Sequence, residues 1–258
     1  MPDQPVLYDL TDGIATITLN RPEVMNALSA GLRRDLLAAL GRARAEARVM
    51  VLTGTGRAFC SGQDLQDAGQ IGSFDLERIL NDEYVPMIKA ITDSPIPTIA
   101  AVNGAAAGAG ANLALAADIV IATESASFIQ AFTRIGLVPD AGGSYWLPRQ
   151  IGMARAMGAM LLGDRISAVQ AAEWGMIYEA VPDAGFAERV RARAVQLAAG
   201  PGVAYRGVKA MLRASFGNDL DAQLALEARL QGACGQTQDF REGVAAFLEK
   251  RAARFTGS

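Results

Sequence analysis

The chain of 258 residues is long enough to bury a sizeable core in one large domain. Its net charge of −3 lacks the excess of Lys and Arg that neutralises nucleic-acid phosphates, so we expect no nucleic-acid partner. The sequence contains no histidine, which excludes Ser-His and Cys-His nucleophile systems and any metal site built on imidazole. A general base must therefore be Asp, Glu, Lys, Tyr or Cys.

The first half of the chain alternates short apolar strands with helical patterns. Leu7–Asp9 and Ile14–Leu19 flank TDG and predict a hairpin, and Ser29 has the position of a helix N-cap. Further patterns predict the strands Val49–Thr53, Ile99–Val102 and Ile119–Ala122, a helix Phe74–Thr92, and a glycine-rich turn that opens a helix before Asp118. Strands that alternate with helices indicate an α/β fold with a parallel sheet and right-handed crossovers.

After about Gly152, helical patterns dominate. They predict helices over Met153–Leu162, Ser167–Trp174, Phe186–Ala199, Val203–Phe216, Leu220–Cys234 and Phe240–Lys250. We place a boundary near Gly200, which gives a core of residues 1–200 and a helical region of residues 201–258. Because the last helices have apolar faces that a small appendage can hardly bury, we expect them to pack against other subunits.

The composition also bears on the compartment. Two cysteines, Cys60 and Cys234, are too few for a disulfide framework, and the N-terminal MPDQPVLYDL lacks the basic and apolar regions of a signal peptide. The apolar run Ile99–Ala122 has the length of a membrane span, yet it is rich in Ala and Gly and contains Asn and Asp. Two short strands flanking a helix explain it better. We therefore expect a cytoplasmic protein without a membrane partner.

Two strand-to-helix loops, Gly54–Leu65 and Asn103–Asn112, are rich in small residues. Small residues let a ligand approach the backbone, and the first N–H groups of a helix have no internal partner. Two such N–H groups that converge on one point form an oxyanion hole. The alternative is that these glycines only form turns.

The stretch GLVPDAGG, residues 136–143, places a carboxylate in apolar surroundings. From Ser94 to Trp146 the only Asp, Glu, Lys or Arg residues are Asp118, Glu124, Arg134 and Asp140. Loss of hydration raises the pKa of a carboxyl group and makes the carboxylate a better base near neutral pH. The alternative is that Asp140 caps a helix that starts at Ala141.

Four motifs together resemble the enoyl-CoA hydratase/isomerase, or crotonase, superfamily. They are NRPEVMNAL (20–28), GRAFCSGQDL (56–65), AAVNGAAAGAGANLALAADIVIA (100–122) and GLVPDAGGSYWLPR (136–149). The resemblance implies a crotonase-like ββα spiral with a C-terminal α-helical trimerisation region, assembled as a homotrimer or a dimer of trimers. It also implies an acyl-CoA thioester substrate whose oxygen is held by the backbone N–H groups of Gln63 and Ala109. No metal or further cofactor is expected, since no ligand cluster or dinucleotide fingerprint is present.

The same resemblance implies a set of residues along the thioester and its CoA: Met25, Ala27, Leu28, Ala58, Cys60, Ser61, Asp64, Leu65 and Lys250. Lys250 is expected either to meet CoA phosphates, including those of a CoA bound to a neighbouring subunit, or to be solvated surface. Cys60 has no His base and fits a packing residue better than a nucleophile. We expect Asp64 to order its loop.

The carboxylates of the superfamily's hydratases are not matched here. Their two glutamates correspond to Asn112 and Phe132, neither of which can take a proton at neutral pH. Asp140 remains, and one carboxylate facing an enolate can move a proton between two carbons without water. The sequence therefore favours isomerisation over hydration.

Longer segments resemble one subgroup, the ring 1,2-epoxyphenylacetyl-CoA isomerases of phenylacetate catabolism. They are AAGAGANLALAADIVIA, FIQAFTRIGLVPDAGGSYWLPR, AEWGMI and DFREGVAAFLEKRAARFTG. This resemblance implies that Asp140 is the catalytic acid/base, that the ring epoxide becomes an oxepin-CoA, and that a shift of 3-enoyl-CoA to 2-enoyl-CoA is a related activity. The alternatives are an enoyl-CoA hydratase that uses Asp140 and a non-catalytic acyl-CoA-binding protein.

Overall fold

A computed structural model describes residues 4–65 and 75–258 and contains a six-stranded sheet in the order β1-β2-β3-β5-β7-β10. Strands β1 (Val6–Thr11) and β2 (Ile14–Leu19) form the predicted antiparallel hairpin. The remaining strands run parallel to their neighbours: β3 (Val49–Gly54), β5 (Thr98–Val102), β7 (Ile119–Thr123) and β10 (Glu179–Val181). The predicted parallel sheet is confirmed.

A second, four-stranded sheet was not predicted from the sequence. Its order is β4 (Ala58–Cys60), β6 (Ala105–Ala107), β8 (Ser127–Ile129) and β9 (Arg165–Ser167). β4, β6 and β8 follow β3, β5 and β7 directly along the chain, so each successive unit contributes one strand to each sheet. These strands have only three residues each, and β6 consists of alanine, which has low β-propensity.

The helix after Ser29 is α1 (Ala30–Glu46), and the Ser29 side chain accepts a hydrogen bond from the amide of Leu32 as expected for an N-cap. The predicted helix 74–92 consists of α2 (Leu76–Ile79), a π-helical turn η2 (Leu80–Tyr84) and α3 (Val85–Thr92); its first predicted residue lies outside the described part of the chain. Pro86 has no N–H for a regular helical bond, which accounts for the wider turn just before it.

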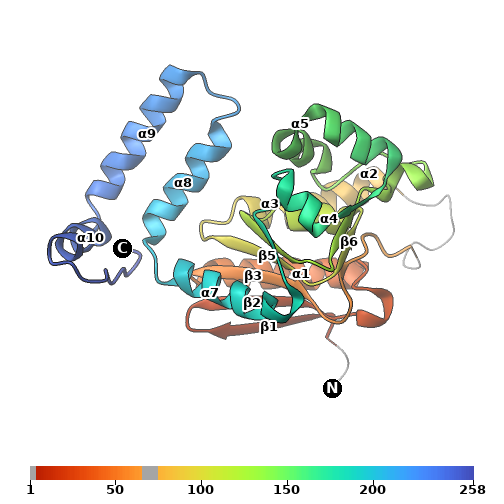
Figure 1. Cartoon of the computed structure of the whole chain (residues 1–258), viewed down its shortest axis with the longest axis horizontal. Coiled ribbons are helices and arrows are strands. Elements are labelled where there is room, and N and C mark those ends of the chain that lie inside the picture. The colour runs from red at the N-terminus through yellow and green to blue at the C-terminus, as the bar shows by residue number, and fades with distance from the viewer. Residues whose placement is uncertain (1–3, 66–74) are drawn as a thin grey trace.

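The remaining helices follow the predicted order (Figure 1): α4 (Ala109–Leu115), α5 (Gly143–Leu162), α6 (Ala168–Glu173), α7 (Phe186–Ala198), α8 (Gly202–Ala214), α9 (Leu220–Gly235) and α10 (Gln238–Leu248). Short 3₁₀ turns are η1 (Pro22–Val24), η3 (Ala131–Ile135) and η4 (Asp183–Gly185). Helix α5 starts ten residues before its predicted start at Met153 and kinks at Gly152, where φ is 77°. The sequence pattern had therefore detected only its second half.

Both faces of the six-stranded sheet are buried at its central strands β3, β5 and β7. One face packs on a large apolar cluster that includes Leu32, Leu36 and Leu113 from α1 and α4. The other face packs on Val190 and Ala194 of α7. A sheet that is buried on both faces requires nearly continuous apolar strands, which explains why every residue of β5 is buried.

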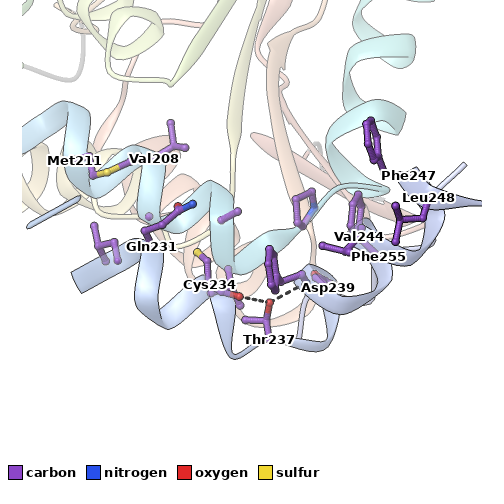
Figure 2. A pocket seen from close by; sticks show the side chains of 17 residues that line it. Val208, Met211, Gln231, Cys234, Thr237, Asp239, Val244, Phe247, Leu248 and Phe255 are labelled. Atoms are coloured by element: carbon purple, nitrogen blue, oxygen red, sulfur yellow. Dashed lines mark hydrogen bonds between the residues drawn. The ribbon is translucent and has the colours of Figure 1, made fainter. Parts of the chain in front are cut away.

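Helices α8, α9 and α10 stand to one side of the two sheets (Figure 1). Between them lies a cavity of about 480 Å³ with a mostly apolar lining, to which Val208, Met211, Val244 and Phe247 contribute (Figure 2). The chain then returns toward the core, where Arg48 donates hydrogen bonds to the carbonyl oxygens of Thr256 (2.7 Å) and Gly200 (2.8 Å). Among the described residues, none of the helices combines the length and hydropathy needed to cross a membrane.

Candidate active site

Asp140 lies between η3 and α5, and it does not cap the helix. Helix α5 begins at Gly143 with Gly142 as its N-cap, and no side chain accepts a hydrogen bond there. The capping alternative is therefore wrong. The Oδ1 atom of Asp140 is instead buried without a hydrogen-bond partner among the residues described.

Burial determines the acidity of this carboxyl group. Desolvation raises the pKa of Asp140 to about 6, and a hydrogen bond from its own backbone N–H opposes the rise in part. A carboxylate with a pKa near 6 is mostly ionised at pH 7 and is a stronger base than an exposed aspartate. Its environment suits it to take and return a proton near neutral pH.

The backbone after Asp140 has an unusual conformation. Ala141 has φ of 48° and Gly142 has φ of 85°, so two successive residues are left-handed. A Cβ on Gly143 would collide with the side-chain amide of Asn112, and only glycine avoids this collision. A non-glycine residue with positive φ is strained, and such strain persists where surrounding contacts hold the chain.

Asn112 supplies that contact. Its Nδ2 donates to the backbone oxygen of Asp140 (2.8 Å), and its Oδ1 accepts from Nε2 of Gln130 (2.8 Å). Both amide side chains are buried. Asn112 thus holds the loop that carries Asp140. The hydratase pattern has a glutamate at the position of Asn112. The contribution of Gln130 depends on this tertiary contact and has no signal in the sequence.

The loops that carry Gln63 and Ala109 are in contact. A Cβ on Gly62 would lie 2.8 Å from the carbonyl oxygen of Ala107 and 3.4 Å from the amide nitrogen of Ala109. Gly62 has φ of 93°, so the close approach and the backbone conformation both favour glycine.

The backbone N–H groups of Gln63 and Ala109 are outside the regular hydrogen-bond pattern. Leu28 and Gln63 form an isolated parallel β-bridge through Leu28 N to Gly62 O (2.8 Å) and Asp64 N to Leu28 O (3.4 Å), a pattern that does not use the N–H of Gln63. Ala109 is the first residue of α4, where an N–H has no acceptor within the helix. Two such donors on touching loops can hold a developing oxyanion.

Helix α4 connects these donors to the carboxylate. Asn112 lies three residues after Ala109 and donates to the backbone of Asp140. One helical turn therefore joins the second N–H donor to the loop of the candidate base. Gly62, the neighbour of Gln63, thus approaches Ala109, and Asn112 binds the backbone of Asp140, so the three candidate residues lie on segments that are linked by contacts.

The other residues implied for substrate binding fall into two groups. Ala27, Leu28, Ala58, Cys60 and Asp64 are buried, whereas Met25, Ser61 and Leu65 retain exposed surface. Asp64 forms an ion pair with Arg21 (Oδ2 to Nη1, 2.7 Å), which fits its expected role in ordering the loop.

Lys250 lies two residues beyond α10, and α10 is on the opposite side of the molecule from α4 and α5 (Figure 1). Within one chain, the end of the C-terminal region and the carboxylate loop are therefore far apart. Contact between Lys250 and a CoA bound at this site would require a second subunit.

Cys60 fits the expected packing role. Burial raises the pKa of its thiol to about 12, and its Sγ donates to the carbonyl oxygen of Asn26 (3.2 Å). A thiol with such a pKa is not a nucleophile near neutral pH. In the part of the chain that is described, no three His, Cys, Asp or Glu side chains group together in a way that could hold a metal ion.

The sequence model of the enoyl-CoA hydratase/isomerase family matches residues 9–258. The chain belongs to this family. A probable enoyl-CoA hydratase of Rhodobacter capsulatus is 62% identical over 98% of both chains, and the 1,2-epoxyphenylacetyl-CoA isomerase of Escherichia coli is 44% identical over 98% of both. A crystal structure of an enoyl-CoA hydratase from Bacillus anthracis covers 99% of this chain and 100% of its own, with a TM-score of 0.94 and 34% identity.

These similarities confirm the crotonase fold and the C-terminal helices that the sequence predicted. The chain has Asn112 and Phe132 at the two positions where the hydratase pattern of the superfamily has glutamates. Both are buried, and the ring of Phe132 lies 3.7 Å from the position of a Cβ on Gly108. The ring of Phe132 therefore lies beside Gly108, the residue before the second N–H donor.

Proposed function

We propose that this enzyme is an acyl-CoA isomerase with Asp140 as its single proton shuttle. The observation that carries the proposal is the buried carboxylate of Asp140, whose pKa is raised to about 6, in a site where Asn112 and Phe132 cannot exchange protons. Hydration needs a water that is held and split. A double-bond shift needs only one base that removes a proton and returns it elsewhere.

The roles of the residues follow from this chemistry. The N–H groups of Gln63 and Ala109 donate to the thioester oxygen and stabilise the enolate that forms when a proton leaves carbon 2. Asp140 takes this proton and returns it to carbon 4, so that 3-enoyl-CoA becomes 2-enoyl-CoA. In phenylacetate catabolism, the corresponding reaction would convert ring 1,2-epoxyphenylacetyl-CoA to oxepin-CoA; in fatty acid metabolism, it would be the double-bond shift.

A proton transfer of this kind requires no redox group or Lewis acid, so we propose that coenzyme A, as part of the substrate, is the only cofactor-like group involved. Activity that persists after dialysis against EDTA, without added nucleotide, supports this proposal. Activity that disappears and returns with a divalent ion contradicts it.

We also propose that residues 201–258 form an oligomerisation region that assembles a homotrimer or a dimer of trimers. Helices α8, α9 and α10 and the connection between α8 and α9 expose many large apolar side chains: Val208, Leu212, Phe216, Leu220, Leu224, Phe240, Val244, Phe247 and Leu248. Single exposed apolar residues are normal on a protein surface, but this many on three neighbouring helices suit burial against another copy of the chain. A neighbouring copy would also bring its Lys250 toward the CoA.

A hydratase is the second candidate, because the 62% identical relative is named a probable enoyl-CoA hydratase. The two are separated by ultraviolet absorbance of the conjugated enoyl thioester. With 3-enoyl-CoA, isomerisation increases this absorbance; with crotonyl-CoA, hydration decreases it. An increase with the first substrate and no change with the second supports the proposal, hydration of crotonyl-CoA supports the alternative, and tight binding without turnover indicates an acyl-CoA-binding protein.

A further inference from the structure

The side chain of Gln63 is held by two buried donors. Tyr84, the last residue of the π-helical turn η2, is only 2% exposed, and its hydroxyl donates to Oε1 of Gln63. Nη1 of Arg33, from α1, donates to the same oxygen (3.1 Å). A side-chain carbonyl with two donors has little freedom to rotate, so its residue is fixed more firmly than a loop position usually is.

Arg33 is itself fixed from several sides. Its guanidinium pairs with Glu83 (Nη2 to Oε2, 2.7 Å), its Nη1 also donates to the carbonyl oxygen of Leu28 (2.5 Å), and its central carbon lies 5.1 Å from the ring centre of Tyr84. Leu28 is the partner of Gln63 in an isolated β-bridge. The same buried cation therefore restrains Gln63 through its side chain and through Leu28, its backbone partner.

We propose that Tyr84 is a positioning residue for the oxyanion site, which acts through the side chain of Gln63 to hold the Gln63 backbone N–H toward the thioester oxygen. This inference rests on the oxyanion role proposed for Gln63. Small errors of position at a reacting group are costly, since a displacement of about 1 Å can reduce the rate about 100-fold.

The hydroxyl of Tyr84 is suited to be a constant donor. Burial raises the pKa of Tyr84 well above its ordinary value, and the nearby charge of Asp140 adds to the rise, while Arg33 opposes it. The phenol thus stays protonated throughout the pH range in which Asp140 titrates.

Tyr84→Phe removes only the hydroxyl. Oε1 of Gln63 keeps its hydrogen bond from Arg33, so no buried acceptor is left without a donor, and the fold should hold. Tyr8→Phe is a matched control, because the Tyr8 hydroxyl donates to Glu46 (3.3 Å) at an exposed site. We expect kcat for 3-enoyl-CoA to fall about 10–100-fold in Tyr84→Phe, with KM nearly unchanged, because the lost positioning acts on the transition state.

The direct measurement is the infrared stretch of a ¹³C-labelled thioester carbonyl in crotonyl-CoA bound to each variant. Two well-placed N–H donors polarise the carbonyl and lower its frequency. We expect a clear lowering in the wild type and in Tyr8→Phe, and a smaller one in Tyr84→Phe. A lower kcat with an unchanged carbonyl frequency would overturn the inference, because Tyr84 would then act elsewhere; unchanged kcat and frequency would overturn it as well.

A double variant tests whether Tyr84 acts through Gln63. Gln63→Met keeps the backbone N–H and removes the acceptor, so adding Tyr84→Phe to it should lower kcat no further; a further drop equal to that of the single variant contradicts the inference. The result is also separable from the proposed function. If carbonyl polarisation depends on Tyr84 but the enzyme fails to isomerise 3-enoyl-CoA, the inference is supported and the isomerase proposal is refuted. If the enzyme is an active isomerase whose rate and carbonyl frequency do not change in Tyr84→Phe, the isomerase proposal is supported and the inference is refuted.

Discussion

Replacement of Asp140 by Asn should change the stability of the fold in a pH-dependent way. Burial raises the pKa of this carboxyl from 3.8 to about 6, and a tenfold change in proton affinity between the unfolded and folded states corresponds to about 1.4 kcal/mol. The folded state binds the proton more tightly than the unfolded state does. The free energy of unfolding therefore falls as pH rises from about 4 to about 6, and above this range the buried charge costs the wild type about 3 kcal/mol.

An asparagine at this position cannot ionise and avoids that cost. Its amide would be buried without a partner, as Oδ1 now is, at a cost of about 1–3 kcal/mol that does not depend on pH. The robust quantity is therefore the difference in unfolding free energy between variant and wild type, which should rise by about 2–3 kcal/mol from pH 4 to pH 8. In melting temperature this is a relative gain of roughly 4–12 °C for a chain of this size.

The assay is thermal or urea unfolding of both proteins at several values of pH. Asp164→Asn is the matched control, since Asp164 is exposed and its replacement should leave the difference flat. A flat difference for Asp140→Asn as well would show that the carboxylate is not desolvated in the folded protein, and the reasoning about its basicity would fail.

Three further predictions concern the base, the cysteine and the assembly. Because Asp140 must be ionised to act, kcat/KM for 3-enoyl-CoA should fall about tenfold per pH unit below a pKa of about 6, and a profile that is flat down to pH 5 would contradict this. Burial raises the pKa of Cys60 to about 12, so iodoacetamide at pH 8 should label Cys60 in the native protein far more slowly than Cys234, as read by peptide mass spectrometry. Phe247, 83% exposed on α10, should support assembly; the wild type should sediment as a trimer or hexamer and Phe247→Lys as a smaller species, whereas a monomeric wild type at micromolar concentration would refute the proposed interface.

Much of the fold was predictable because its longer elements are strongly patterned. The hairpin of β1 and β2, the capped helix α1 and the apolar strands β3, β5 and β7 all matched their sequence signals. The second sheet was not predictable, since its strands are three residues long and pair only with segments distant in sequence. Local pattern carries no information about such pairing.

The candidate site, like the fold, was predictable from the sequence only in part. The scarcity of charges around Asp140 correctly predicted a desolvated carboxylate, but the capping alternative was wrong because the left-handed Ala141 and Gly142 delay the start of α5 to Gly143. The contacts of Gln63 with Arg33 and Tyr84 join residues 30 and 21 positions apart, so only the tertiary structure reveals them. One signal was available: Arg33 interrupts the buried face of α1 beside Leu32 and Leu36, where a charge requires a partner.

The most direct test of the proton shuttle is kcat of Asp140→Asn with 3-enoyl-CoA, measured on the same preparation whose folding has been established by its melting temperature. The account predicts a fall of about 10²–10⁴-fold, the usual contribution of general acid–base catalysis, with thioester binding retained because the N–H groups of Gln63 and Ala109 belong to the backbone. Asp164→Asn should match the wild type. A folded Asp140→Asn variant that isomerises 3-enoyl-CoA at nearly the wild-type rate would contradict the central claim.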